Sequence, residues 1–199
     1  MKAYELALKH RDIIIGFGMA GWSDGTSPLQ FNEVYTRARA DGFKLTIHCD
    51  PHIANIHNHI YESATQLGGG GVDRIDHGIN TADKQELIQL VRSKNLGLTI
   101  CPWITQPGLM DRPDPEAALY DGIIRKLYDN GVKISIGSDD PALVLDRYLT
   151  ENMEAVAEKG RFTEGEIRQL CLNAVDTSWA SDELKAELRA EVLAYNPKH

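Results

Sequence analysis

The sequence has few cysteines and no long apolar run. Its cysteines, Cys49, Cys101 and Cys171, are odd in number and far apart, which fits neither a disulfide framework nor paired C-x-x-C zinc motifs. No apolar run approaches the roughly 20 residues that a membrane span requires. The N-terminal MKAYELALKHRD is charged and amphipathic rather than an apolar signal region. We therefore expect a cytoplasmic protein that is neither secreted nor embedded in a membrane.

The sequence also lacks an excess of positive charge. It has 21 Lys and Arg residues against 29 Asp and Glu residues, for a net charge of -8 and a pI near 5.3. No cationic stripe is present to offset the charge of a phosphate backbone or an anionic lipid surface. We expect no nucleic-acid partner and no membrane partner, and small neutral or cationic ligands are easier to accommodate.

The chain does contain alternating strand-like and helix-like segments. Each apolar, β-branched stretch precedes a segment with apolar residues at helical spacing, which ends in Gly or Asn. This alternation predicts βαβ units and a parallel sheet of the α/β class. The five strand-like stretches are residues 12–18, 43–48, 72–77, 96–101 and 132–139, and the pattern is wholly helical after residue 140.

A parallel sheet of this kind is either an open doubly wound sheet or part of a (β/α)8 barrel. Five strands do not close such a barrel, so an incomplete barrel is expected. We predict one domain over residues 1–199, with the partial barrel at 12–145 and a C-terminal helical part at 146–199. The GGGG tract at 68–71 precedes a strand instead of joining a strand to a helix, which indicates a loose turn and not a phosphate-binding loop.

Polar residues with reactive side chains gather at the carboxyl ends of the predicted strands, the edge at which both kinds of α/β enzyme build their sites. They are His48, Asp76, His77, Cys101, Asp139 and Asp140. Taken alone, His48 is readily explained by a bond to a backbone carbonyl. Cys101 is better explained by buried packing than by nucleophilic reactivity, because no basic group lies near it in the sequence.

The adjacent carboxylates Asp139 and Asp140 have two interpretations. Aspartate before Pro141 is a common helix start, so one of the pair is suited to an N-cap. Capping needs only one carboxylate, and two adjacent carboxylates repel each other unless a cation or hydrogen-bond donors offset them. A doublet beside histidines therefore indicates a catalytic zinc or a similar divalent ion.

Five motifs together resemble the adenosine/adenine deaminase family of zinc aminohydrolases, in the order that the family has them. They are GFGMAG at 16–21, TIHCD at 46–50, RIDHGIN at 74–80, TICPW at 99–103 and IGSDDPALV at 136–144. The resemblance implies a (β/α)8 barrel whose zinc activates a water for attack on C6 of a purine, with release of ammonia.

The resemblance also implies roles for individual residues. His48 and Asp139 correspond to zinc ligands, and His77 corresponds to the residue beside the zinc-bound water that takes its proton or holds its charge. Asp140 corresponds to a residue that holds a purine ring nitrogen by a hydrogen bond. Gly21 corresponds to the position where the backbone approaches the base.

Two features depart from the family pattern. The family's first strand supplies a His-x-His pair with two further zinc ligands, but GFGMAG resembles the fourth family strand, so about three βα units have no counterpart here. The glutamate that protonates the purine in much of the family is replaced by Pro51. Asp50 is a candidate substitute, and a helix cap after Pro51 explains it equally well. His57 and His59 do not replace the missing pair, because neighbours two apart on a helix point nearly opposite ways.

These observations leave three functional hypotheses. The first is a zinc-dependent purine aminohydrolase, acting on an adenosine-type or adenine-type small molecule and weakened by the missing strands. The second is a non-catalytic remnant that forms homo-oligomers through exposed barrel edges. The third is a different metal hydrolase on an open five-stranded sheet.

Overall fold

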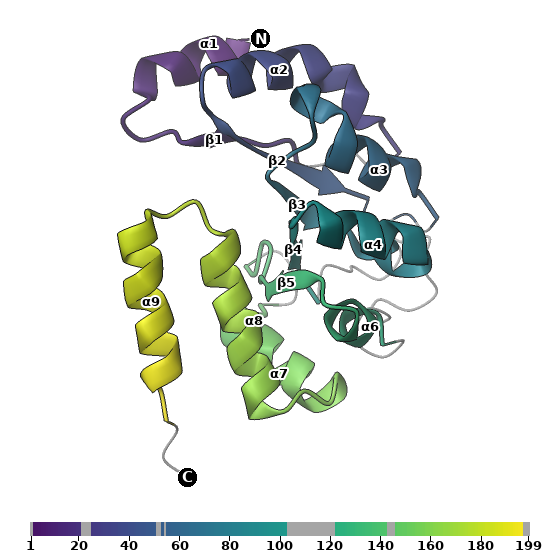
Figure 1. Cartoon of the computed structure of the whole chain (residues 1–199), viewed down its shortest axis with the longest axis vertical. Coiled ribbons are helices and arrows are strands. Elements are labelled where there is room, and N and C mark those ends of the chain that lie inside the picture. The colour runs from purple at the N-terminus through teal and green to yellow at the C-terminus, as the bar shows by residue number, and fades with distance from the viewer. Residues whose placement is uncertain are drawn as a thin grey trace.

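One parallel sheet organises the chain (Figure 1). The computed structural model describes residues 2–20, 25–50, 53, 55–102, 122–142 and 146–196. The strands follow sequence order across the sheet, which confirms the predicted parallel α/β class. They are β1 (Gly16–Phe17), β2 (Lys44–Cys49), β3 (Arg74–His77), β4 (Gly97–Ile100) and β5 (Lys133–Ile136).

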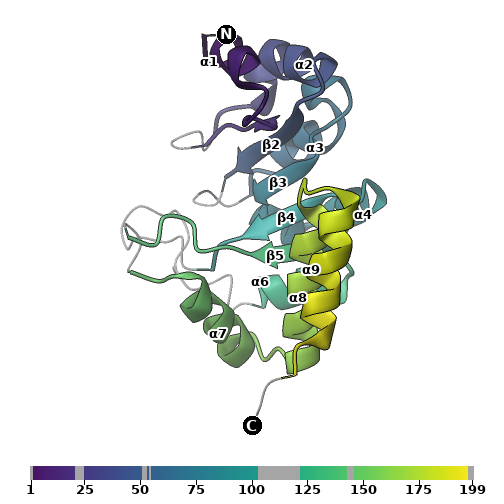
Figure 2. The ribbon, with the colours of Figure 1, turned by 90° about the vertical axis from the view of Figure 1, so that its left-hand side faces the viewer.

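Helices lie on both sides of this sheet. Figures 1 and 2 show α3, α4 and α6 on one side and α8 and α9 on the other. The α-helices are α1 (Lys2–Ala7), α2 (Asn32–Ala40), α3 (Asn58–Thr65), α4 (Gln85–Ser93), α6 (Ile123–Asp129), α7 (Leu149–Lys159), α8 (Glu164–Thr177) and α9 (Asp182–Ala194). Short 3-10 segments span Leu8–His10, Pro28–Phe31, Leu67–Gly69 and Ile79–Asp83. No described helix has the length and apolar character needed to cross a membrane.

The core forms where the strands meet the helices. Branched apolar side chains of the strands and of α3, α4 and α6 belong to one cluster of buried residues. Its fully buried members include Leu45, Ile47, Ile75, Leu98, Ile134, Ile60, Ile88 and Leu127, each 0% exposed. Burying such side chains stabilises the fold by about 1.5–3 kcal/mol each. The carboxyl ends of the strands are therefore held by a rigid base.

The two outer strands differ in how their free edges are covered. Among the described residues β1 pairs only with β2, and Ile13 and Ile15 before it are 73% and 56% exposed. The predicted buried strand at 12–18 is thus too long and too deeply placed, because an edge strand lacks the neighbour that would cover it. At β5, the Nδ2 of Asn173 from α8 donates a hydrogen bond to the Ile134 carbonyl at 3.1 Å. The described strands form part of a barrel and do not close one.

The glycine tract is a tight turn that leads into β3. Gly71 has a φ of +98°, and a Cβ placed there would lie 2.1 Å from the Ala64 carbonyl oxygen. The turn therefore requires glycine for close backbone approach. The turn is tighter than the loose turn expected, and glycine allows its backbone to pack against that of Ala64.

Candidate metal centre

The strands end at one edge of the sheet, as the sequence predicts. In the register of β2 and β3, His48 lies opposite Asp76 and Cys49 lies opposite His77. In Figure 2 the arrowheads of β2 to β5 point the same way. Residues that follow these strands are therefore neighbours in space although they lie up to about 90 positions apart in the sequence.

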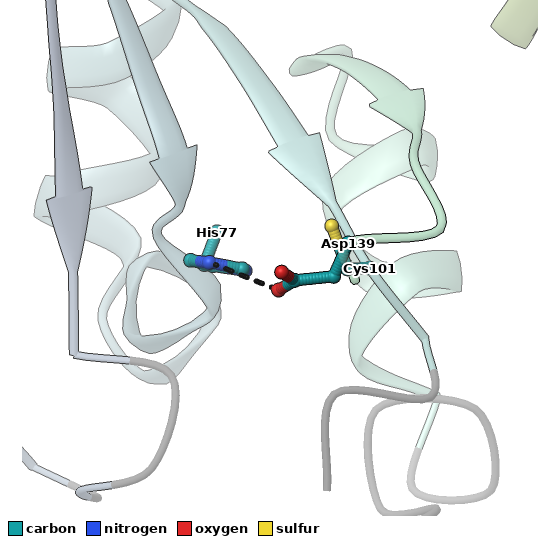
Figure 3. Close-up of side chains that lie close together, drawn as sticks. All are labelled: His77, Cys101 and Asp139. Atoms are coloured by element: carbon teal, nitrogen blue, oxygen red, sulfur yellow. Dashed lines mark ion pairs between the residues drawn. The ribbon is translucent and has the colours of Figure 1, made fainter. Parts of the chain in front are cut away.

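Three of the predicted strand-end residues form a compact cluster. Potential ligand atoms of His77, Cys101 and Asp139 all lie within 4.8 Å of one another. The Nε2 of His77 and the Oδ2 of Asp139 are 3.6 Å apart, and Figure 3 shows the imidazole and the carboxylate facing each other. His77 and Cys101 are 4% and 7% exposed, while the Asp139 side chain is 27% exposed. The cluster is thus buried on the protein side and reachable from solvent on the carboxylate side.

His48 adds a second imidazole beside this cluster. Its ring centroid lies 4.3 Å from that of His77, and the two rings meet edge to face at 80°. Two imidazoles, a thiol and a carboxylate therefore gather at the ends of four consecutive strands, β2 to β5. Nitrogen, sulfur and oxygen donors are the ligand types that zinc uses, so the chemistry of the residues present fits the ion that the resemblance implies.

The backbone at three of these strand ends is left-handed. Asp50, His77 and Asp139 have φ values of 37°, 61° and 57°. For residues other than glycine such a conformation costs about 1–3 kcal/mol, and it is found where surrounding structure enforces it, often at functional sites. The left-handed turn redirects each side chain at the point where its strand ends.

The thiol of Cys101 is chemically quiet in this setting. Burial is the main cause that raises its pKa above the ordinary value, and the Asp139 carboxylate adds to the rise. Without a metal, the group is a protonated thiol at neutral pH, in keeping with the expectation that it is no nucleophile. The interpretation as packing missed that the thiol also faces the site. Its strand-end position, shared with the other candidates, was the signal that could have revealed this.

The carboxylate doublet divides between two environments. Among the described residues, the cluster includes Asp139 but not Asp140, although both residues are exposed. A turn follows them, and α7 begins at Leu149 with Tyr148 as its N-cap. Neither carboxylate therefore caps α7, the next described helix.

Asp50 is part of a buried pair that the sequence did not reveal. Its Oδ1 accepts a hydrogen bond from the Gly25 N–H at 2.8 Å, and its Oδ2 lies 2.7 Å from the Nδ1 of His59. Asp50 and His59 are 3% and 5% exposed. Asp50 does not cap α3, whose N-cap is His57. Asp50 is nine residues from His59 and 25 residues from Gly25 in the sequence. No local sequence pattern indicates either contact.

His57 and His59 have different partners, as helical geometry predicts. The Nε2 of His57 lies 2.9 Å from the Oδ2 of Asp83, whereas His59 contacts Asp50. Gly21, proposed to adjoin the base, lies outside the described residues, as does Pro51.

Comparisons with known proteins place this site in context. The family model described as "Adenosine deaminase" matches residues 2–195. A deaminase of Schizosaccharomyces pombe is 36% identical over 177 residues, which cover 89% of this chain and 49% of that protein. An adenine deaminase of Rhodospirillum rubrum is 33% identical over 96% of this chain and 54% of its own length. The chain thus spans about half the length of these relatives.

A solved structure supports the same fold. The chain superimposes on an amidohydrolase from Burkholderia ambifaria with bound zinc at a TM-score of 0.84 and 27% identity. The match covers 96% of this chain and 51% of that structure. The described arrangement of strands and helices is therefore shared with a protein of about twice the matched length.

Proposed function

Because the chain belongs to the adenosine deaminase family, we propose that it carries the strand-end half of a zinc-dependent purine aminohydrolase site. The observation that carries the proposal is the approach of His77 to Asp139, 3.6 Å between Nε2 and Oδ2, at an edge that also holds His48. A relative that is an adenine deaminase and a fold neighbour with bound zinc support it.

In this proposal, His48 and Asp139 hold the metal. Imidazole nitrogen and carboxylate oxygen from β2 and from the segment after β5 are donors that zinc accepts. A bound divalent ion supplies Lewis-acid activation of water at neutral pH. The partial exposure of the Asp139 carboxylate leaves the solvent side of the site open for water and substrate.

His77 handles the proton. Its burial and its left-handed backbone fix the ring, and Nε2 faces Asp139 across 3.6 Å. A neutral Nε2 can take a proton from an attacking water and hold the charge near a carboxylate, which stabilises the imidazolium.

The remaining proposed residues bind or protonate the purine. Asp140 is exposed beside the cluster and accepts a hydrogen bond from a ring nitrogen, while Gly21 lets the backbone approach the base. Asp50 takes the place of the family glutamate as proton donor. Each oxygen of Asp50 has one partner, Gly25 or His59, and because a carboxylate oxygen has two lone pairs, it can carry a proton for the substrate beside that contact.

The proposal is tested by zinc content and ammonia release. The purified chain is loaded with zinc, dialysed and analysed for bound metal, and ammonia is then measured with adenine and with adenosine as substrates. We expect one zinc per chain and ammonia from one of the two purines. Asp139→Ala is expected to lose both properties, because the site loses its carboxylate donor.

Other results would favour other functions. Bound zinc without ammonia release from either purine would favour the non-catalytic alternative. Unchanged zinc content and turnover in Asp139→Ala, with the circular dichroism of the wild type, would remove Asp139 from the ligand set and overturn the proposal.

A further inference from the structure

Two side-chain contacts join the end of β2 to one face of α3. The Sγ of Cys49 lies 3.4 Å from the Oγ of Ser63, and the Oδ2 of Asp50 lies 2.7 Å from the Nδ1 of His59. His59 and Ser63 are four positions apart in α3, so they lie on the same face of the helix. This face of α3 therefore contacts the last residue of β2 and the residue that follows it.

His59 has a fixed position because the same turn of α3 is buried in the core. Ile60 and Ser63 are 0% exposed, Ala64 is 1% exposed, and His59 itself is 5% exposed. Protein interiors are close-packed, so a side chain buried among such neighbours has few rotamers open to it. The Nδ1 of His59 is thus a stationary hydrogen-bonding atom beside the end of β2.

The contacts of Asp50 hold its carboxyl group at both oxygens. Oδ1 accepts a hydrogen bond from the Gly25 N–H at 2.8 Å, in the segment after β1, and Oδ2 contacts His59 at 2.7 Å. One contact alone would leave the carboxyl group free to turn about its last side-chain bond. Two contacts on different oxygens define its plane, two residues after His48.

The orientation of this carboxyl group matters for the reaction that we assign to it. A general acid must lie within hydrogen-bond reach of the atom that it protonates. A misplacement of about 1 Å can lower a rate about 100-fold. A side chain that fixes the Asp50 carboxyl group therefore contributes to the rate without touching the substrate.

We propose that His59 is a positioning residue for the Asp50 carboxyl group and acts through its Nδ1. The inference rests on the proposed function, because it concerns the proton donor of that reaction. It leaves the roles of His48, His77 and Asp139 unchanged and gives a role to a residue on α3. The Gly25 N–H holds the other oxygen and completes the support.

Glutamine and asparagine substitutions separate the two ring nitrogens of a histidine. The side-chain amide nitrogen of Asn lies near the place of Nδ1, whereas that of Gln reaches the place of Nε2, and both amides are donors. We expect His59→Gln to lower kcat for ammonia release from the purine substrate about 10- to 100-fold, with KM and zinc content unchanged. His59→Asn should retain the kcat of the wild type.

His57→Gln is the matched control. His57 contacts Asp83 through its Nε2 at 2.9 Å, the nitrogen whose place Gln can take. This variant should keep the kcat of the wild type. An equal fall of kcat in His57→Gln and His59→Gln would overturn the proposal, because it would show a general effect of the substitution.

A double-mutant cycle tests whether His59 acts through Asp50. Asp50→Asn removes the acid and keeps the shape of the side chain, so His59→Gln should lower kcat no further in that background. The same loss in both backgrounds, or a wild-type kcat in His59→Gln, would overturn the role of His59 and leave the proposed function standing.

Two further outcomes are decisive. If circular dichroism shows that His59→Gln does not fold, His59→Asn decides, and a fall in its kcat with intact zinc content would overturn the role of His59. Absence of ammonia release from the zinc-loaded wild type with either purine would overturn the proposed function and this inference with it.

Discussion

The roles proposed for single residues at the strand ends differ even where the residues are adjacent in sequence. Both Asp139 and Asp140 are exposed, but only Asp139 belongs to the cluster with His77. Replacing a carboxylate that binds metal should lower zinc content, whereas replacing one that binds substrate should lower turnover alone. The two assignments can therefore be tested separately.

Asp140→Asn is expected to keep its zinc and lose turnover. A hydrogen bond to a charged group contributes about 1.5–3 kcal/mol, so kcat/KM should fall about 10- to 100-fold if the chain is active. Zinc content by mass spectrometry and ammonia release report the two properties separately. Loss of zinc in this variant would show that both carboxylates serve the metal.

The Asp50–His59 pair is expected to matter for stability. His59→Leu leaves a buried carboxylate without its imidazole partner, and breaking such a pair costs about 3 kcal/mol. The measurement is the free energy of unfolding in urea at pH 7. His59→Asn retains a donor and should recover part of the loss, which a purely steric effect would not show.

His57→Leu is the matched control for His59→Leu. The His57 side chain and its partner Asp83 are 17% and 31% exposed, so their contact should contribute below about 1 kcal/mol. Equal losses in the two variants would contradict the special role given to the buried pair.

At the scale of helices and strands, α8 links the C-terminal helices to the sheet. Its Asn173 covers a carbonyl of β5, and its N-terminus is fixed by a capping box between Thr163 and Glu166. The Glu166 carboxylate also pairs with Arg125 of α6 at 2.6 Å. The start of α8 is therefore tied both to its own backbone and to a neighbouring helix.

The capping box makes a pH dependence predictable. Hydrogen bonds from Arg125 and from Thr163 lower the pKa of Glu166 to about 2 from 4.5. A carboxylate whose pKa is lowered on folding stabilises the fold above its unfolded pKa, and this contribution is lost as pH falls through the folded pKa. The stability that Glu166 adds should thus be complete above about pH 4.5 and decline towards pH 2.

Glu166→Gln tests this dependence in urea unfolding between pH 7 and pH 3. The variant should be less stable than the wild type at pH 7, and the difference should shrink as pH falls below 4.5. In an Arg125→Met background the substitution should have a smaller effect, since the largest cause of the lowered pKa is gone. A difference that stays constant with pH would show that Glu166 acts through packing alone.

Much of this arrangement follows from local sequence patterns, and the rest depends on contacts across the fold. Helical periodicity and Gly or Asn stops predict helices between the strands, where α2 and α4 lie, and strand-end position predicts the approach of His77 to Asp139. The length of β1 was wrong, because burial of a strand depends on a neighbour that the strand itself does not encode. The Asp50–His59 pair could not be predicted for the same reason, because it depends on a contact between segments that the local sequence does not encode.

At the scale of the whole molecule, the unpaired edge of β1 is a surface suited to association with another chain. Among the described residues β1 pairs with β2 alone, and Ile13 and Ile15 are mostly exposed beside it. The β5 edge differs, since Asn173 already satisfies one of its carbonyls. An open strand edge with apolar neighbours promotes association between chains.

We therefore expect the chain to self-associate through the β1 edge. Light scattering after gel filtration should give a mass above 22.1 kDa that rises with protein concentration. Ile13→Lys combined with Ile15→Lys should return the mass towards that of the monomer, because charge on an edge opposes pairing. Leu193→Lys is the matched control, as Leu193 is 58% exposed on α9 and should not matter. A monomeric wild type would exclude association, and equal effects of the β1-edge and α9 substitutions would place it elsewhere. A β1-dependent dimer would show that the chain covers its β1 edge by pairing with another copy.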